Sequence, residues 1–233
     1  MTRGRALAIA LLVGCTAPAA DRAPNAVQAA PVLVALDAPA RGPEGSDALP
    51  ATRVAFRMPD GSLRPVDGQA IAFVPRWRDG AALVDPERRV YEVRPDEQRR
   101  MLARGGSGAL ATDGERLAYV VTDGVLGELR VHDGARERTV ARELASIGVL
   151  RIAGDRVLFV GGRPGGVAGV WLASIAGQPA RCLTNCDLVT GTDWRPRFVP
   201  PPASPDAFEV TPGAVAWIDP SGVRREAPLE GSP

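Results

Sequence analysis

Short apolar runs separated by turn residues recur along most of the chain. A turn followed by an apolar strand with one aromatic residue occurs four times, as VDGQAIAFV, TDGERLAYV, AGDRVLFV and TPGAVAWI. The aromatic residues are Phe73, Tyr119, Phe159 and Trp217. A recurrence of about 40 to 45 residues with several short strands per unit is typical of β-propeller blades. The pattern therefore predicts an all-β protein.

The strands of each unit can be followed in the same pattern. The first unit would contain LRPV, AIAFV, AALVD and VYEV, the second GALAT, RLAYVV, ELRVH and ERTVA, and the third GVLRI, RVLFV, GVWLAS and PARCLT. In RVLFV, residues 156–160, both faces of the strand are apolar, so we expect neighbouring sheets to cover it on two sides. The prediction is a small β-propeller of four to five four-stranded blades.

The ends of this array need a closing strand. The fourth unit provides AFEV, AVAWID and VRREA, but no fourth strand follows. We expect RVAFR, residues 53–57, to pair with VRREA, residues 223–227, so that an N-terminal strand closes the ring and removes an exposed edge. PVLVAL, residues 31–36, would either add to that blade or begin a fifth.

The third unit carries a resemblance to a known repeat. Gly154-Asp155, Phe159, Trp171, Ala176-Gly177 and the run from Arg181 to Thr184 follow the order of turn, aromatic strand, second aromatic strand, turn and Arg-Leu-Thr strand. In this order the unit resembles the blades of TolB-type propellers. The resemblance covers about residues 60–230 and implies the fold. It implies no activity, because unrelated exported proteins share the repeat.

The N-terminus has the build of an export signal. Arg3 and Arg5 precede the apolar run from Ala6 to Val13, which is shorter than the ~20 residues that span a bilayer. Leu12-Val13-Gly14-Cys15 resembles the bacterial lipobox, which implies cleavage of residues 1–14 and a lipid on Cys15. An ordinary signal peptide is the alternative. Residues 15–50 would then form a flexible tether and residues 51–233 the propeller.

Charge and localisation follow from the same region. The formal net charge is +1, and all 28 basic residues are Arg. Loss of Arg3 and Arg5 with the signal leaves a nearly neutral chain, so we expect no nucleic-acid partner. Attachment to the membrane would be through the N-terminal lipid. Thr16 after the lipidated residue favours the outer membrane, facing the periplasm or the surface, over the inner membrane.

The other two cysteines form an even pair. If Cys15 is lipidated, Cys182 and Cys186 remain, in a compartment that favours disulfides. An extended chain would place their Cα atoms ~13 Å apart, too far for a bridge. We therefore predict a disulfide with a turn at Asn185, and two buried free thiols are the alternative.

Little in the sequence points to catalysis. His132 is the single histidine, and no nucleophile motif or set of metal ligands surrounds it. Each Asp-Gly pair is a favourable hairpin turn and lacks the alternating acidic residues of a calcium loop. We predict no catalytic, metal or cofactor residue and no cofactor. A hydrolase with its site in the propeller mouth, where Arg64, Arg151 and Glu209 would lie, is one alternative. A purely structural surface protein is another.

A binding face is the remaining hypothesis. Three segments would form long loops on one side of the propeller, at residues 75–79, 161–168 and 189–206. These loops would gather Arg76, Trp77, Arg78, Trp194, Arg195 and Arg197. Arginine and tryptophan stack on rings and bind carboxylates or phosphates. The sequence therefore predicts a binding or scaffold module at the cell envelope, with an envelope protein or an anionic ligand as its partner.

Overall fold

The computed structural model describes residues 30–39, 49–166, 168–184, 208–210, 214–218 and 221–228. All regular elements in this part of the chain are β-strands, β1 to β18, and none of them is a helix. The predicted all-β class is confirmed. No helix long and apolar enough to cross a membrane occurs among the described residues.

The strands form five antiparallel sheets. The first sheet contains β1 (Val32–Ala35), β2 (Thr52–Arg57) and β3 (Leu63–Ala70). The second contains β4 (Ala72–Trp77), β5 (Gly80–Val84), β6 (Arg89–Val93) and β7 (Arg99–Arg104). The third contains β8 (Gly106–Thr112), β9 (Leu117–Thr122), β10 (Gly127–His132) and β11 (Glu137–Leu144). The fourth contains β12 (Ser146–Ala153), β13 (Arg156–Gly162), β14 (Gly169–Ser174) and β15 (Arg181–Cys182), and the fifth contains β16 (Phe208–Val210), β17 (Ala214–Ile218) and β18 (Arg224–Pro228).

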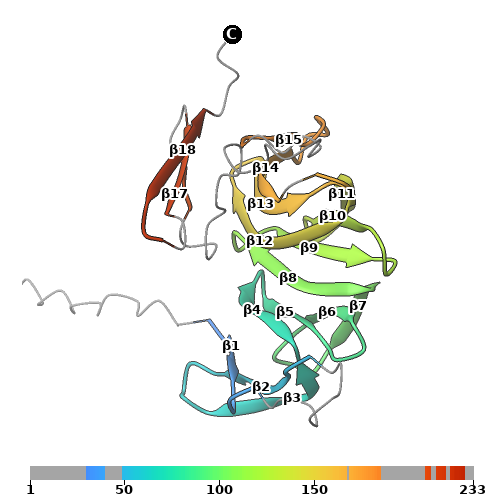
Figure 1. Ribbon diagram of the computed structural model, residues 1–233. Coiled ribbons are helices and arrows are strands. Elements are labelled where there is room, and N and C mark those ends of the chain that lie inside the picture. Colours follow the sequence, from blue (N-terminus) through green and yellow to red (C-terminus); the bar gives the residue numbers. More distant parts are fainter. Residues whose placement is uncertain are drawn as a thin grey trace, which may run out of the picture.

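Consecutive sheets pack face to face as the blades of a β-propeller. The first four sheets follow one another from blue to orange in Figure 1, and the fifth, in red, lies to one side. The first strands of neighbouring sheets, β4, β8 and β12, contact one another, and the later strands extend outward. Four apolar clusters fill the four successive interfaces. This radial repetition confirms the predicted propeller architecture.

Strand β13 shows why its sequence is apolar on both faces. Val157 and Phe159 lie in the cluster between the third and fourth sheets, whereas Leu158 lies in the cluster between the fourth and fifth. All three side chains are fully buried. The expectation that neighbouring sheets cover this strand on two sides is confirmed.

The predicted Asp-Gly turns are also confirmed where they join strands of the third sheet. Oδ1 of Asp113 accepts hydrogen bonds from the backbone N–H groups of Glu115 (3.0 Å) and Arg116 (2.7 Å). Asp123 and Asp133 make the same pair of bonds in the next two turns. These carboxylates satisfy backbone donors within the turn, which is why Asp precedes Gly there.

The strand assignment of the first predicted unit is wrong by one strand. Phe73 lies in β4, the first strand of its sheet, whereas Tyr119, Phe159 and Trp217 lie in second strands. LRPV belongs to β3, which pairs with β2 in the sheet before. Apolar runs of similar length on every strand do not by themselves show which run comes first in a blade, so the repeat can be assigned one strand out of step.

Single residues that connect the last strand of one sheet to the first strand of the next establish the correct strand order. β3 passes to β4 through Ile71, β7 to β8 through Gly105, and β11 to β12 through Ala145. At each corner this residue makes a backbone hydrogen bond to the end of the second strand of the following sheet. β3 therefore corresponds to the outermost strands β7 and β11. The first sheet accordingly consists of the three outer strands of a blade.

The predicted closure by residues 53–57 is wrong. These residues lie in β2, whose two edges pair with β1 and β3, so no edge is available for β18. β18 pairs only with β17 among the described strands. PVLVAL supplies β1 and begins a sheet of its own with β2 and β3, separate from that of β18, which agrees with the alternative of a fifth blade. The first sheet therefore includes Val32–Ala35, inside the segment predicted to be tether.

Candidate functional site

The β6–β7 hairpin separates two surface hollows. Its turn, residues 94–98, is closed by a hydrogen bond from the N–H of Arg94 to the carbonyl of Gln98 (3.0 Å), with Glu97 at a φ of 69°. On one side lies a groove against the first sheet, and on the other a smaller hollow against the third sheet. Arg94 and Gln98 line both.

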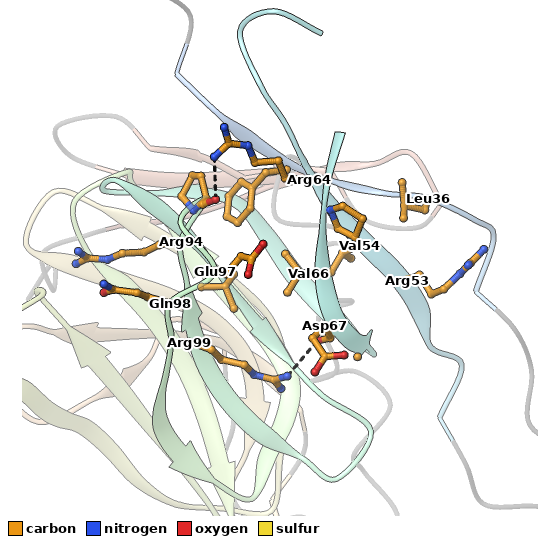
Figure 2. A pocket seen from close by; sticks show the side chains of 15 residues that line it. Leu36, Arg53, Val54, Arg64, Val66, Asp67, Arg94, Glu97, Gln98 and Arg99 are labelled. Atoms are coloured by element: carbon orange, nitrogen blue, oxygen red, sulfur yellow. Dashed lines mark hydrogen bonds between the residues drawn. The ribbon is translucent and has the colours of Figure 1, made fainter. Parts of the chain in front are cut away.

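The groove has an apolar floor and charged walls (Figure 2). Its volume is about 730 Å³. Val54, Phe56 and Val93 are buried in the floor and belong to the cluster between the first two sheets. The charged and amide residues of the walls are Arg53, Arg64, Asp67, Arg94, Glu97, Gln98 and Arg99.

Two arginines cross the groove in opposite directions. Arg64 of β3 donates from Nη1 to the carbonyl of Pro95 (3.5 Å), and Arg99 of β7 donates from Nη1 to the carbonyl of Asp67 (3.1 Å), as Figure 2 shows. Across the groove, each therefore contacts a neutral carbonyl on the other wall. Arg64 is exposed and has no carboxylate at ion-pair distance among the described residues.

Arg99 is held in place by groups behind the groove. Its guanidinium lies 3.6 Å from the centroid of the Tyr91 ring. Its Nη2 lies 3.4 Å from Oδ2 of Asp85, a carboxylate whose side chain is only 3% exposed. Asp85 also accepts the Nε–H of Arg89 (2.7 Å). Stacking and a buried acceptor fix the plane of the Arg99 guanidinium, so it needs little ordering to bind a ligand.

Arg53 closes one end of the groove through an ion pair. Its Nε lies 2.7 Å from Oδ2 of Asp37, and Thr52 donates its hydroxyl hydrogen to the same carboxylate (2.8 Å). The hydrogen bonds from Arg53 and Thr52 lower the pKa of Asp37 to about 2. The pair is exposed, so its role is to order the segment after β1 rather than to add much stability.

The hollow on the other side of the hairpin holds three arginines. It has a volume of about 240 Å³ and is lined by Arg78, Glu92, Arg94, Gln98, Arg100 and Gly134. The Glu92 side chain is 8% exposed and lies 3.1 Å from Nη2 of Arg94 and 2.7 Å from Nη2 of Arg100. Arg78 donates from Nη1 to the carbonyl of Asp133 (3.2 Å).

The structure contradicts one residue of the predicted binding face, Trp77. Trp77 is 1% exposed, packs in the cluster between the second and third sheets, and donates from Nε1 to the carbonyl of Glu115 (3.0 Å). It cannot contact a partner. Trp77 pairs with Gly80 across a tight hairpin, so residues 75–79 are not a long loop. Trp194, Arg195 and Arg197 lie outside the described residues.

The one-strand error also put Arg76 and Arg78 at the wrong end of the propeller. Arg78 lies in the turn between first and second strands of its sheet, whereas residues 161–168 connect second and third strands. Such turns alternate between the two ends of a blade, so these segments lie at opposite ends. Arg76 donates from Nη2 to the carbonyl of Ala30 (3.1 Å), and Arg78 lines the hollow.

The other predicted residues have mixed outcomes. Cys182 lies on β15, whereas its predicted partner Cys186 and the predicted lipidation site Cys15 lie outside the described residues. Arg64 lies on an outermost strand rather than in the channel, and Glu209 is paired with Arg224 (3.0 Å). His132 is buried, and its Nδ1 accepts the N–H of Gly134 (2.8 Å), which is a structural contact.

The sequence reasoning missed most of the arginines around the hairpin. Arg94, Arg99 and Arg100 lie in RPDEQRR, which reads as an ordinary solvated turn. The sequence does contain a signal for a positively charged site, because this turn has three arginines within seven residues beside two carboxylates. No group of three or more potential metal ligands occurs among the described residues.

Comparisons with known proteins assign the chain to no family. No protein-family model and no curated protein matches the chain. TolB from Acinetobacter baumannii is 16% identical over 85% of this chain and 52% of that one, with a TM-score of 0.46. A puromycin hydrolase mutant complexed with PGG is 14% identical over 76% and 28%, with a TM-score of 0.47. A nidogen–laminin complex contains a chain 13% identical over 72% and 64%, with a TM-score of 0.46.

The fold defines the class of protein. The chain spans between about a quarter and two thirds of the length of these three structures. Five consecutive antiparallel sheets that pack face to face make it a β-propeller, of the fold that the TolB-type resemblance implied. Fold alone does not assign a function, which has to be argued from the site.

Proposed function

We propose that this protein is an envelope lipoprotein, anchored through Cys15, whose propeller binds a protein or an anionic envelope ligand. The observation that carries the binding role is the groove between the first and second sheets. An apolar floor of buried valine and phenylalanine lies between arginines that are fixed by stacking and hydrogen bonds. Such a combination supplies apolar contact area and oriented donors for carboxylates.

Charge reversal in the groove tests this role. Arg64→Glu replaces an exposed guanidinium of the groove wall, and Arg57→Glu makes the same change on β2 at an exposed residue that does not line the groove. In pull-downs from solubilised envelopes, we expect the Arg57→Glu protein to capture the same partner as the wild type. The Arg64→Glu protein should lose it while melting at the wild-type temperature. Equal capture by both variants would place the partner elsewhere.

The anchor is tested separately from binding. Intact-mass analysis of the mature protein should show loss of residues 1–14 and an acylated N-terminal Cys15. Fractionation should place the protein with the outer membrane, and Cys15→Ser should release it. Normal maturation of the Cys15→Ser protein with retention at the membrane would refute lipid anchoring.

The disulfide between Cys182 and Cys186 belongs to the same proposal, because it needs an oxidising compartment. An alkylating reagent applied to the denatured, exported protein should label these two thiols only after reduction. Labelling of both before reduction would show the alternative, two free thiols.

A further inference from the structure

Different contacts position the guanidinium groups of the three arginines that line the hollow. Oε1 of the buried Glu92 accepts two bonds from Arg94, from Nε (3.3 Å) and Nη2 (3.1 Å). Its Oε2 accepts the Nε–H of Arg100 (2.8 Å). One desolvated carboxylate therefore positions two guanidinium groups, and both of its oxygens are occupied. A buried acceptor of this kind keeps the two cations ordered at the surface.

Arg78 approaches the same hollow from the β4–β5 turn. Its backbone N–H bonds to the carbonyl of Gly114 (2.7 Å), and it adopts a φ of 54°. Its guanidinium lies directly against Gly134, where an added Cβ would overlap it. The positive φ of Gly134, 91°, favours glycine at this position. The hydrogen bond to the Asp133 carbonyl and the contact with Gly134 place the third guanidinium at the hollow.

The charges of the hollow do not cancel. It is lined by three guanidinium groups and one carboxylate, and that carboxylate is already shared by two of them. Arg78 bonds to a neutral carbonyl and has no carboxylate at ion-pair distance among the described residues. The positive charge left over faces a space of about 240 Å³.

We infer that the hollow is a binding site for a compact oxyanion, a carboxylate or a phosphate group, held between Arg78, Arg94 and Arg100. Gln98 lines the same space and carries an amide donor. Guanidinium groups bind both kinds of oxyanion through paired N–H donors. The inference rests on the proposed binding function, which it refines by naming the chemical group that the protein recognises beside the groove.

His132 provides a direct reporter of this site. It is the single histidine of the chain, and its Nδ1 accepts the N–H of Gly134, which lines the hollow. Burial and the positive charge of Arg100 lower the pKa of its imidazole. A bound oxyanion offsets the charge of Arg100, so binding should raise the pKa of His132.

The experiment titrates the isotope-labelled full chain with inorganic phosphate at constant ionic strength. We expect saturable shifts of the Gly134 amide and the His132 ring, and a higher His132 pKa when phosphate is bound. Arg78→Ala should weaken binding about tenfold, because a charge-assisted donor pair is lost. Arg136→Ala removes an exposed arginine of the adjacent β10–β11 turn that does not line the hollow, and should bind as the wild type does.

Further arms identify the source of the oxyanion. Titration with acetate probes a protein carboxylate, and vesicles of phosphatidylglycerol probe a lipid headgroup. Saturable binding of any of the three probes that depends on Arg78 supports the site. The inference is overturned if every probe gives only a linear drift, or if Arg78→Ala binds as tightly as Arg136→Ala.

Failure of this site is distinguishable from failure of the proposed function. The Arg64→Glu protein, altered only in the groove, should bind phosphate as the wild type does even though it loses its envelope partner. If the Arg64→Glu protein captures its partner normally while phosphate binding at the hollow is confirmed, the proposal of partner binding in the groove is wrong. The proposal of an oxyanion site in the hollow is then still supported.

Discussion

Trp77 shows how one side chain can be assigned the wrong role from its type alone. Arginines on both sides in RWR suggest an exposed aromatic residue at a binding face, but in β4 the side chains alternate between the two faces of the sheet. Arg76 and Arg78 are exposed, while Trp77 between them fills the core against the third sheet. Its indole also meets His132 edge to face, with ring centroids 5.5 Å apart.

Trp77→Ala should therefore destabilise the protein rather than only weaken binding. Loss of a fully buried indole and of its bond to Glu115 should reduce the free energy of unfolding by about 3–5 kcal/mol. Urea denaturation followed by tryptophan fluorescence or circular dichroism measures this. Arg76→Ala, next to it but exposed, should change the free energy by less than about 0.5 kcal/mol. Equal and small effects would contradict the buried position.

His132 should make stability depend on pH in a definite direction. Its pKa in the folded protein lies below the ordinary value of 6.5, so below that value the unfolded chain binds more protons than the folded one. The free energy of unfolding should fall as the pH is lowered from about 7.5 to about 5.5. His132→Asn keeps an acceptor for the Gly134 N–H and should show a smaller fall across this range. If the wild type is as stable at the lower pH as at the higher one, the lowered pKa of His132 is contradicted.

At the scale of elements, β1 contributes more than its length suggests. It has four residues, but Leu33 is 1% exposed and lies in the cluster between the first and second sheets. The backbone of β1 also pairs with β2 along its whole length. A strand of this kind belongs to the fold and not to a tether.

Two truncations test this role of β1. A chain that begins at residue 30 should melt at the temperature of the mature protein. A chain that begins at residue 38 should lose at least about 2 kcal/mol of stability, because the Leu33 side chain and one ladder of hydrogen bonds are removed. Calorimetry of the two proteins decides the matter, and equal melting temperatures would refute the role of β1.

Elements differ in how far the sequence specified them. In the second and third predicted units, turn signals between consecutive strands of the unit placed all four strands correctly. In the first unit, PVDGQA contains a turn signal but continues as β3, with Gly68 at a positive φ inside an irregular part of the ladder. The sequence cannot distinguish a bulge from a turn at such a glycine, because both need the same backbone conformation.

At the scale of the whole molecule, each sheet is stabilised mainly by the sheets next to it. Four separate clusters fill the four interfaces. Phe56 lies in the cluster between the first two sheets, and Trp217 lies in the cluster between the last two. A substitution in one interface should therefore destabilise only the sheets on either side of it, as in other proteins whose units contact only adjacent units.

Hydrogen exchange tests this independence with a matched pair of variants. Trp217→Ala should increase amide exchange in β17 and β18 and leave β5 and β6 unchanged, because the third and fourth sheets lie between β17 and the second sheet. Phe56→Ala should have the opposite pattern: amide exchange should become faster in β1 to β3 and stay unchanged in β17. Faster exchange throughout the chain in both variants would show one cooperative unit instead.

The sequence by itself determined the all-β class, the repeated four-stranded unit and the two-sided burial of β13. These properties depend on local patterns: apolar runs of strand length, and turn residues that favour particular backbone conformations. Only the tertiary structure decided which strand begins each blade, and therefore which end of the propeller carries each turn. It also decided that β2 is an inner strand of the first sheet, and that arginines from the first two sheets surround one hairpin. The physical reason is that an apolar residue is equally stabilised against any apolar neighbour, so the pattern identifies what is buried but not the partner that buries it.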